Sequence, residues 1–402
     1  MSPPSLGSAG PADRRPREDR QGERGAALVA VGPLSRGGGE TRFGILTSDL
    51  YFVNPAALGS QRSLSPKGSL PHMADRLDAT APANEFEAEV EVEMLNLDAT
   101  SYRQIRLACD NDADAMAARI RAIVAERGKL HNPVTGSGGV LLGHLSVLGA
   151  SFWQAGLLLG QRVVPLASLV ATPLRLDDVG PVDLTSPQVP ARGRAIVTGR
   201  MSCAAVPDDL PLSVVLTALD VYPAASHVRS LARPGDHVII IGSGHAGLAA
   251  AAAAREAVGS TGGVTVIDPS TDALGWAAAV DPAATTVVAD ATDAFGVAGM
   301  LGARGLWRGD LTLVCTNVTG CEGTAILLTK DDGTVLFFST ATSFSAAGLG
   351  ADSLSSLATL SIPNGYTPDR GSYLLDLLRR SPALLSALGG GRNGADGPGV
   401  GK

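Results

Sequence analysis

A glycine-rich loop near the middle of the chain has the residue types and the spacing that bind a dinucleotide. It fits the pattern G-x-G-x-x-G with the residues Gly242, Ser243, Gly244, His245, Ala246 and Gly247. Glycines at these places permit a tight turn, close approach of the backbone to a pyrophosphate, and close packing of a helix on a strand. Asp268 follows about 20 residues later, where an acid binds the ribose hydroxyls of NAD and repels the 2′-phosphate of NADP. The loop therefore predicts a dinucleotide site that favours NAD, with NADP as the alternative.

The segments around this loop have the patterns of the elements that must hold it. Residues 238–241 are β-branched and apolar, as in a buried parallel strand, and residues 246–258 are rich in alanine and of helical length. Apolar runs at 285–289, 311–315 and 333–339 alternate with helical stretches, which is typical of a doubly wound parallel sheet. Such sheets bind cofactors at the carboxyl ends of their strands. Three residues at those ends therefore join the predicted cofactor site, namely Thr316, Asn317 and Ser339.

The composition is that of a globular protein with a sizeable core. The 402 residues suffice for two domains and tails, and 45% of them are hydrophobic. The formal net charge of −7 at pH 7 argues against a nucleic acid or an anionic membrane as the partner. None of the four cysteines forms a Cys-x-x-Cys pair, so reduced thiols in a cytoplasmic protein are expected.

A second loop, residues 129–139, is dense in polar groups and glycines. Its Gly136-Ser137-Gly138, followed by Gly160-Gln-Arg-Val163, resembles the Gly-His-Glu … Gly-Asp-Arg-Val pattern of the medium-chain dehydrogenase/reductase superfamily. Zinc-dependent members carry a histidine ligand in the first tripeptide, where this chain has Ser137. They also carry a cysteine where this chain has residues 97–101. Because a catalytic zinc needs about three protein ligands, no metal is expected here.

The superfamily resemblance implies a fold and a domain order. The expected fold class is α/β, with a GroES-like β-rich catalytic domain followed by a doubly wound Rossmann domain that binds the nucleotide. We assign residues 58–211 to the catalytic domain, completed by 345–388, and residues 212–344 to the Rossmann domain. Residues 1–57 contain little apolar surface to bury and are expected to be disordered. Residues 389–402 are expected to form a glycine-rich, flexible tail.

Four further stretches resemble the L-erythro-3,5-diaminohexanoate dehydrogenase family of lysine fermentation. They are Lys129–Gly139, Asn96–Ile105, Ser339–Phe344 and Asn364–Thr367, and the resemblance extends between residues 60 and 385. It implies that a hydride leaves C3 of 3,5-diaminohexanoate for the nicotinamide ring. The resulting iminium group is then hydrolysed, which gives 5-amino-3-oxohexanoate and ammonia.

This reaction implies specific tasks for the residues of the matching stretches. Without zinc, side chains must deprotonate the 3-ammonium group of the substrate and then activate a water molecule. General bases that work near neutral pH are histidines or carboxylates with a shifted pKa, so proton transfer is assigned to His131, Asp98 and Asp220. His131 and Asp98 are expected to face the substrate opposite the nicotinamide. Polar residues assigned to substrate orientation are Asn96, Ser101, Asn132 and Thr135.

Two alternative functions and an assembly state complete the expectations. The first alternative is a zinc-free quinone or enone reductase of the same superfamily that uses NADPH. The second is a dinucleotide-binding redox sensor without turnover, although a sensor needs no dense set of proton-transfer groups. A homodimer or a higher homo-oligomer is expected, because the apolar strand at 334–339 has an edge that a second copy can pair with.

Overall fold

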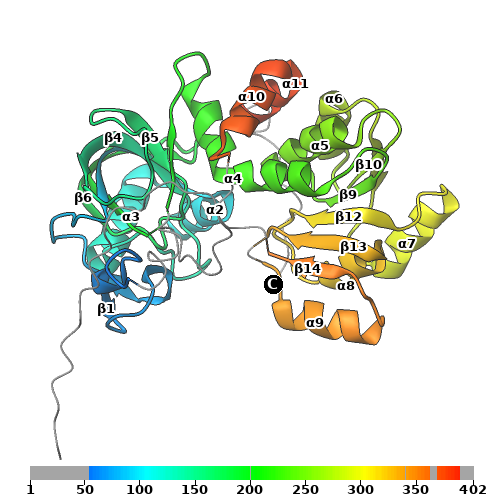
Figure 1. The fold of residues 1–402 in the computed structure, drawn as a ribbon, viewed down its shortest axis with the longest axis horizontal. Coiled ribbons are helices and arrows are strands. Elements are labelled where there is room, and N and C mark those ends of the chain that lie inside the picture. Colours follow the sequence, from blue (N-terminus) through cyan, green and yellow to red (C-terminus); the bar gives the residue numbers. More distant parts are fainter. Residues whose placement is uncertain (1–53, 200, 340, 363–368, 390–402) are drawn as a thin grey trace, which may run out of the picture. The chain divides into compact units, whose positions relative to one another are not determined.

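The computed structural model describes residues 54–199, 201–339, 341–362 and 369–389. Most of the two predicted tails lies outside these ranges, and so does the stretch Asn364–Thr367. Within the described residues the chain is a mixed α/β protein with one antiparallel and one parallel six-stranded sheet (Figure 1). The predicted fold class is therefore confirmed.

The first domain is built on the antiparallel sheet, whose strand order is β6-β7-β3-β4-β5-β8. Its central strand β3 is the segment in which acidic and apolar residues alternate, and Val90 and Val92 point into the core. A two-stranded sheet of β1 and β2 precedes it. The strands are β1 Ser63–Ser65, β2 Arg76–Leu77, β3 Ala88–Asn96, β4 Val140–Leu148, β5 Arg162–Pro165, β6 Leu174–Val179, β7 Gln188–Val197 and β8 Cys203–Ala205.

Two α-helices lie between β3 and β4, and the first of them contributes to the site. The helix α2, Ala99–Ala108, begins directly after β3 because Asp98 caps it. Helix α3, Ala113–Arg127, begins in the same way at Asp112, as expected of aspartate at an N-cap. It ends at Gly128, whose φ of 63° suits glycine at a helix end. Two single-turn 3₁₀ helices, η1 and η2, span Ser60–Arg62 and Pro71–Met73.

The second domain is built on the parallel sheet, with the strand order β11-β10-β9-β12-β13-β14. Numbered from its first strand, this order is 3-2-1-4-5-6, the order of dinucleotide-binding Rossmann domains. The order in which strands are added to the sheet therefore reverses between the parallel strands β9 and β12, and such sheets bind their ligands at this point. The strands are β9 His237–Ile241, β10 Gly263–Asp268, β11 Thr285–Val288, β12 Gly309–Val314, β13 Thr329–Phe337 and β14 Thr359–Ser361.

The carboxyl ends of the three central strands are level with one another. Val314 of β12 lies opposite Ile241 of β9 on one side and Phe337 of β13 on the other. The residues that follow these strands therefore share one edge of the sheet. The helices of this domain are α4 Leu212–Leu231, α5 His245–Val258, α6 Thr271–Val280, α7 Ala294–Ala303, α8 Glu322–Leu327, α9 Phe344–Ser353, α10 Ser372–Arg380 and α11 Pro382–Leu388.

The C-terminal segment departs from the prediction that residues 345–388 complete the first domain. Strand β14 pairs with β13 and extends the parallel sheet. Helices α10 and α11 pack on α4, α5 and α6, with Leu374, Leu377 and Leu378 buried. The same pairing corrects the predicted sheet edge, because β13 is an internal strand and β14 forms the edge.

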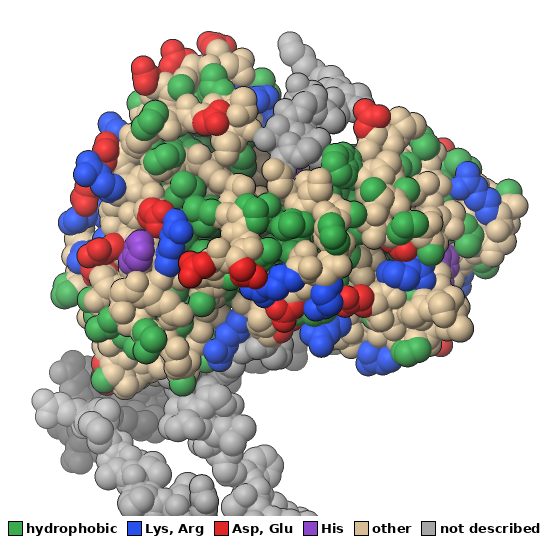
Figure 2. Space-filling view, turned by 90° about the horizontal axis from the view of Figure 1, so that it is seen from above, with side chains coloured by type: hydrophobic (Ala, Val, Ile, Leu, Met, Phe, Trp, Pro, Cys, Tyr) green, Lys and Arg blue, Asp and Glu red, His purple; other side chains and the backbone are tan. Residues whose placement is uncertain are grey.

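Ion pairs connect α10 to α5 and to the segment that precedes α4. Arg380 forms an ion pair of 3.0 Å with Glu256 of α5, and Arg379 forms one of 2.7 Å with Asp209. On the molecular face shown in Figure 2, Lys and Arg side chains lie among Asp and Glu side chains rather than in an area of their own. In the part of the chain that the structure describes, none of the helices has both the length and the apolar character needed to cross a membrane.

Candidate active site

The three glycines of the loop after β9 have three different environments. Gly242 has a φ of 97°, and a Cβ there would lie 2.9 Å from the backbone nitrogen of Thr316. A Cβ on Gly247, in α5, would lie 1.9 Å from the carbonyl oxygen of Gly242, so this glycine lets the helix pack against the loop. A Cβ on Gly244 would meet no protein atom within 4 Å. Gly244 therefore faces open space, which suits the close approach of a pyrophosphate.

The amino end of α5 is available to a phosphate. Its N-cap residue is Gly244, and no side chain caps the helix there. The first backbone N–H groups of a helix have no partner within the helix, and the helix dipole favours negative charge at that end. The loop and the helix together therefore fit the pyrophosphate of a nicotinamide dinucleotide, as the sequence pattern predicted.

Asp268 lies at the end of β10, directly beside the glycine loop. Its Oδ2 accepts a hydrogen bond of 2.8 Å from the backbone N–H of Ser243, and its Oδ1 accepts one of 2.9 Å from the N–H of Ser270. The Ser243 hydroxyl is fully buried and donates to the carbonyl of Ala273 at 2.8 Å. Ser243 therefore orients the acid, and its side chain does not face the cofactor position.

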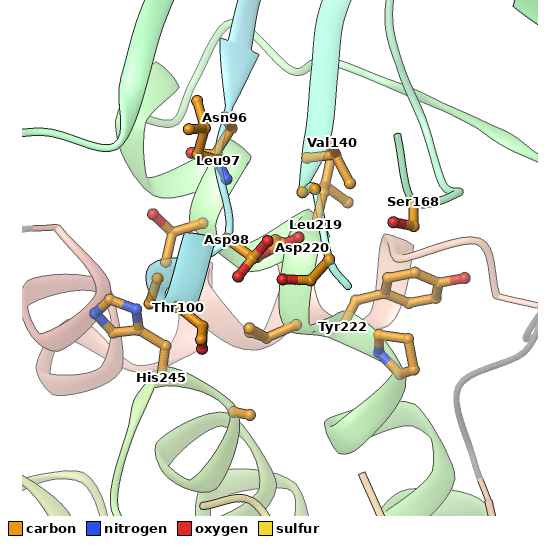
Figure 3. A pocket seen from close by; sticks show the side chains of 18 of the residues that line it. Asn96, Leu97, Asp98, Thr100, Val140, Ser168, Leu219, Asp220, Tyr222 and His245 are labelled. Atoms are coloured by element: carbon orange, nitrogen blue, oxygen red, sulfur yellow. The ribbon is translucent and has the colours of Figure 1, made fainter. Parts of the chain in front are cut away.

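A pocket of about 680 Å³ opens beside this loop (Figure 3). Its lining comes from the end of β3, the start of α2, the loop before β4, helix α4, the glycine loop, and the residues after β12 and β13. The volume is in the range of sites for small molecules and cofactors. The predicted site residues that line the pocket are Asn96, Asp98, Asp220, Gly244, His245, Ala246, Asn317 and Ser339.

Two carboxylates meet in this pocket from opposite elements. Asp98 caps α2, and its Oδ1 accepts a hydrogen bond of 2.9 Å from the N–H of Ser101. Asp220 is half-buried on α4, and Figure 3 shows both carboxylates pointing into the same part of the pocket. Burial, and then the neighbouring charge of Asp98, raise the pKa of Asp220 to about 7. Asp220 therefore changes its protonation state near neutral pH, as a general base must.

The structure does not bring His131 into the pocket lining. The side chain is half-buried, and its Nδ1 is enclosed without a hydrogen-bond partner among the described residues. Burial and the positive charges of Lys129 and Arg127 lower the pKa of His131. Its neighbour Asn132 is also outside the pocket, since its amide donates to Gln104 Oε1 at 2.9 Å. Neither residue therefore lines the pocket, and the Asn132 side chain connects its loop to α2.

Ser101 and Thr135 lie one hydrogen bond behind the pocket lining. Their hydroxyl groups are 2.8 Å apart, and both contact the hydroxyl of Ser137, at 2.8 Å and 2.9 Å. Ser137 itself lines the pocket, at the position where zinc-dependent superfamily members have a histidine. Ser101 and Thr135, which were predicted to bind the substrate, therefore position the hydroxyl group of Ser137. From the sequence, Ser137 was noted only as the residue that stands in place of a zinc-binding histidine.

Sequence reasoning missed several polar residues of the lining. Thr217 and Tyr222 lie on α4 near Asp220, and Ser168 and Ser202 lie in loops of the first domain. Thr217 precedes Asp220 by one helical turn, so the two share a face. That spacing is visible in the sequence, but only once Asp220 is known to face a pocket.

Asn317 connects the two halves of the lining. Its Nδ2 donates to Thr100 Oγ1 of α2 at 2.7 Å, and its Oδ1 accepts from Ser339 Oγ at 3.1 Å. The other predicted cofactor residues do not line the pocket: Gly242, Ser243 and Gly247 belong to the glycine loop and the start of α5, Asp268 ends β10, and Thr316 follows β12. Among the described residues there is no group of three or more His, Cys, Asp or Glu side chains placed to hold a metal ion. The absence of a catalytic zinc stays a prediction.

The glycine loop, the strand order and the pocket define a two-domain α/β protein with a Rossmann domain of the dinucleotide-binding type. The sequence profile of the L-erythro-3,5-diaminohexanoate dehydrogenase N-terminal domain matches residues 61–207. The L-erythro-3,5-diaminohexanoate dehydrogenase of Fusobacterium nucleatum is 35% identical over 329 residues, which cover 81% of this chain and 95% of that protein. The enzyme of the same name from Acetoanaerobium sticklandii is 34% identical over 333 residues, covering 82% and 97%. The chain therefore belongs to the L-erythro-3,5-diaminohexanoate dehydrogenase family.

Solved structures are similar at a lower level. The alcohol dehydrogenase of Thermotoga maritima has a TM-score of 0.46 and 14% identity, and the match covers 76% of this chain and 85% of that one. The quinone oxidoreductase of Coxiella burnetii has a TM-score of 0.45 and 15% identity, covering 76% and 86%. Family membership makes the protein a nicotinamide-dependent dehydrogenase, in preference to the reductase and the sensor.

Proposed function

We propose that the protein catalyses the NAD-dependent oxidative deamination of (3S,5S)-3,5-diaminohexanoate to 5-amino-3-oxohexanoate and ammonia. One observation carries the proposal beyond family membership. Two carboxylates, Asp98 and Asp220, face the pocket, and no described lysine or arginine lines it. A site of this charge suits a substrate with two ammonium groups, since opposite charges stabilise each other at short range.

The proposed reaction balances with one proton left over. The substrate's R₂CH–NH₃⁺ group, NAD⁺ and water give R₂C=O, NH₄⁺, NADH and H⁺. When bound, the cofactor accepts the hydride from C3. The hydride leaves only after the nitrogen has lost a proton, because the nitrogen lone pair must form the C=N bond. The protein must therefore supply a base at the 3-ammonium group before oxidation.

Asp220 is the residue that we propose for this base. Its pKa of about 7 lets it be ionised in a large fraction of molecules at neutral pH and still accept a proton. Loss of a proton from the ammonium group leaves Asp220 protonated and neutral, which burial favours. Water then adds to the iminium carbon and releases one proton to solvent, which is the proton left over. The protonated carboxyl group returns its proton to the nitrogen when ammonia leaves the resulting carbinolamine. His131, which does not line the pocket, has no part in these steps.

The proposal has a direct test. Purified protein should reduce NAD in the presence of (3S,5S)-3,5-diaminohexanoate and release one ammonia per NADH. NADPH-dependent reduction of quinones or enones, together with no activity on the diamine, would contradict the proposal.

Cofactor choice gives a separate prediction. We propose NAD rather than NADP because the Asp268 carboxylate is held at the edge of the glycine loop by Ser243 and Ser270, where it repels a 2′-phosphate. Asp268→Ser should weaken NAD use and narrow the preference of NAD over NADP by about tenfold or more, equivalent to about 1.4 kcal/mol. Steady-state kinetics with both cofactors measure the change. Equal use of both cofactors by the unmutated protein would refute the assignment.

Assembly gives a further prediction. We propose a homodimer or higher homo-oligomer in which β14 of one copy pairs with β14 of another, because an open strand edge is a liability in a monomer. Exposed apolar side chains lie at this edge, with Leu360 36% and Ile362 56% exposed. Leu360→Lys should yield monomers, whereas Leu159→Lys, an exposed leucine of the first domain, should not. Light scattering at micromolar concentration distinguishes these outcomes, and a monomeric wild-type protein would exclude the assembly.

A further inference from the structure

Asp98 is a carboxylate with one satisfied oxygen and one free oxygen. Oδ1 accepts the N–H of Ser101 at 2.9 Å, and the amino end of the ten-residue helix α2 stabilises the negative charge. Oδ2 is enclosed and has no hydrogen-bond partner among the described residues. A buried acceptor without a donor costs free energy, so the pocket is incomplete until a ligand provides a donor at this oxygen.

Asn96 presents a second free acceptor on the same side. It ends β3 two residues before Asp98, and residues two apart in an extended chain point to the same face. The side chain is only 3% exposed, lines the pocket, and has an enclosed Oδ1 without a partner among the described residues. Ser202 is 2% exposed, and its hydroxyl oxygen is also enclosed without a hydrogen-bond partner among the described residues. Three enclosed polar atoms of the pocket therefore lack partners.

The two carboxylates of the pocket differ in what they are equipped to do. Asp220 sits on α4 with no hydrogen-bond partner among the described residues, so its charge is free to be neutralised by a proton. Asp98 is fixed by the helix N–H group and keeps an acceptor directed at the ligand. Among the described residues, no lysine or arginine lines the pocket, so a cationic group of the ligand suits the free oxygen of Asp98.

We propose that Asp98 and Asn96 form a subsite for the second ammonium group of the substrate, the one at C5, and thereby set the selectivity for diamino acids over monoamino acids. The inference rests on the proposed function and adds a specificity site to it. The 5-ammonium group donates to Asp98 Oδ2 and Asn96 Oδ1, while the 3-ammonium group faces Asp220. A substrate without the second amine leaves both acceptors enclosed and unpaired. Sites built to bind an N–H group reject analogues that lack it by about 10⁴-fold or more.

The test compares two substrates in matched variants. Asp98→Asn removes the charge but keeps a good helix cap, because asparagine caps helices as well as aspartate does. The matched control is Asp112→Asn, which makes the same change at the cap of α3, where Asp112 accepts the N–H of Ala115 at 2.8 Å. Kinetics are measured with 3,5-diaminohexanoate and with 3-aminohexanoate. Asn96→Leu tests the second acceptor.

The expected result is a collapse of selectivity. Asp98→Asn should lower kcat/KM for the diamine by about 10²–10³-fold, in line with the loss of a charged hydrogen bond from a buried site. Because loss of the Asp98 charge also acts on Asp220 whichever substrate is bound, the decisive quantity is the ratio of kcat/KM for the diamine to kcat/KM for the monoamine, which should fall by a similar factor. Asn96→Leu should lower this ratio as well. Asp112→Asn should leave the ratio of the two substrates unchanged. An equal fall for both substrates in Asp98→Asn would overturn the subsite and make Asp98 a general catalytic or structural residue.

A binding measurement separates this inference from the proposed reaction. Calorimetry of the protein with NAD compares 1,3-diaminopropane, which has two ammonium groups at the right spacing, with propylamine. Preference for the diamine that Asp98→Asn abolishes supports the subsite even if 3,5-diaminohexanoate is not oxidised, in which case only the proposed function fails. Oxidation of 3,5-diaminohexanoate with an unchanged preference in Asp98→Asn leaves the function standing and rejects the subsite.

Discussion

Replacement of Asp220 by asparagine is expected to lower kcat/KM for 3,5-diaminohexanoate by about 10²–10⁴-fold, the usual cost of removing a general base. Asparagine has a similar size and cannot accept the proton of the 3-ammonium group. NAD affinity should change little, because the glycine loop after β9 is a separate part of the site. Asp114→Asn, an exposed aspartate on α3 that does not line the pocket, serves as the matched control. Near-normal turnover in Asp220→Asn would contradict this role and make Asp98 the next candidate for the base.

The pH profile tests the same assignment without relying on a rate alone. The base acts when it is ionised, and the pKa of Asp220 is raised to about 7. The wild-type kcat/KM should therefore fall as the pH drops through about 7. The residual activity of Asp220→Asn should lack that step, whereas Asp114→Asn should keep it. A wild-type profile without a step near pH 7 would contradict a role for Asp220.

The contribution of Asp220 to the free energy of unfolding should fall as the pH rises, whereas activity should rise. The unfolded chain ionises Asp220 near its ordinary pKa of 3.8, whereas the folded chain does so near 7. The unfolded state therefore binds fewer protons between these values, and this group lowers the free energy of unfolding by at most about 1.4 kcal/mol per pH unit as the pH rises. Asp220→Asn should be more stable than the wild type at about pH 8 by up to a few kcal/mol. Thermal denaturation at about pH 5 and about pH 8 measures the difference.

The sequence predicted the parts of the site that depend on neighbouring residues. The glycine loop, helix α5 and Asp268 belong to one βαβ unit of consecutive elements. Residues close in sequence are therefore close in space, and their spacing alone predicts the site. Asp98 was identified differently, from the resemblance of the stretch Asn96–Ile105 to a known family. In the loop of residues 129–139, the sequence alone did not indicate which side chains line the pocket. Gly138 and Gly139 pack against the carbonyl oxygens of Leu130 and Asn96, and this crossing brings Ser137 to the pocket while His131 stays behind it.

Other parts of the fold had no usable local signal. Strand β14 has three residues, too few for a period of two to be recognised, so its pairing with β13 was missed. Helix α4 is apolar on most of its surface, with eleven buried residues. Its pattern therefore does not show which face carries the site. The raised pKa of Asp220 is due first to burial and then to the charge of Asp98, which is distant in sequence, and both arise only in the folded chain.

The glycine loop gives the second large expected effect, and two substitutions separate binding from folding. Gly244→Ala should leave the fold intact, since its φ of −70° suits alanine and the new Cβ meets no protein atom within 4 Å. The Cβ occupies the space that the pyrophosphate approaches, so NAD should bind about 10- to 100-fold more weakly. Calorimetric titration with NAD measures this loss.

Gly247→Ala should instead damage the domain itself. The new Cβ would lie 1.9 Å from the carbonyl oxygen of Gly242, a backbone atom that moves only if α5 shifts away from β9. Overpacking of this kind typically costs about 1–3 kcal/mol, so both the melting temperature and NAD binding should fall. Gly275→Ala is the control, because this exposed glycine of α6 has open space at its Cβ and should gain slight stability. Wild-type NAD affinity in Gly244→Ala, or wild-type stability in Gly247→Ala, would contradict the roles assigned to these glycines.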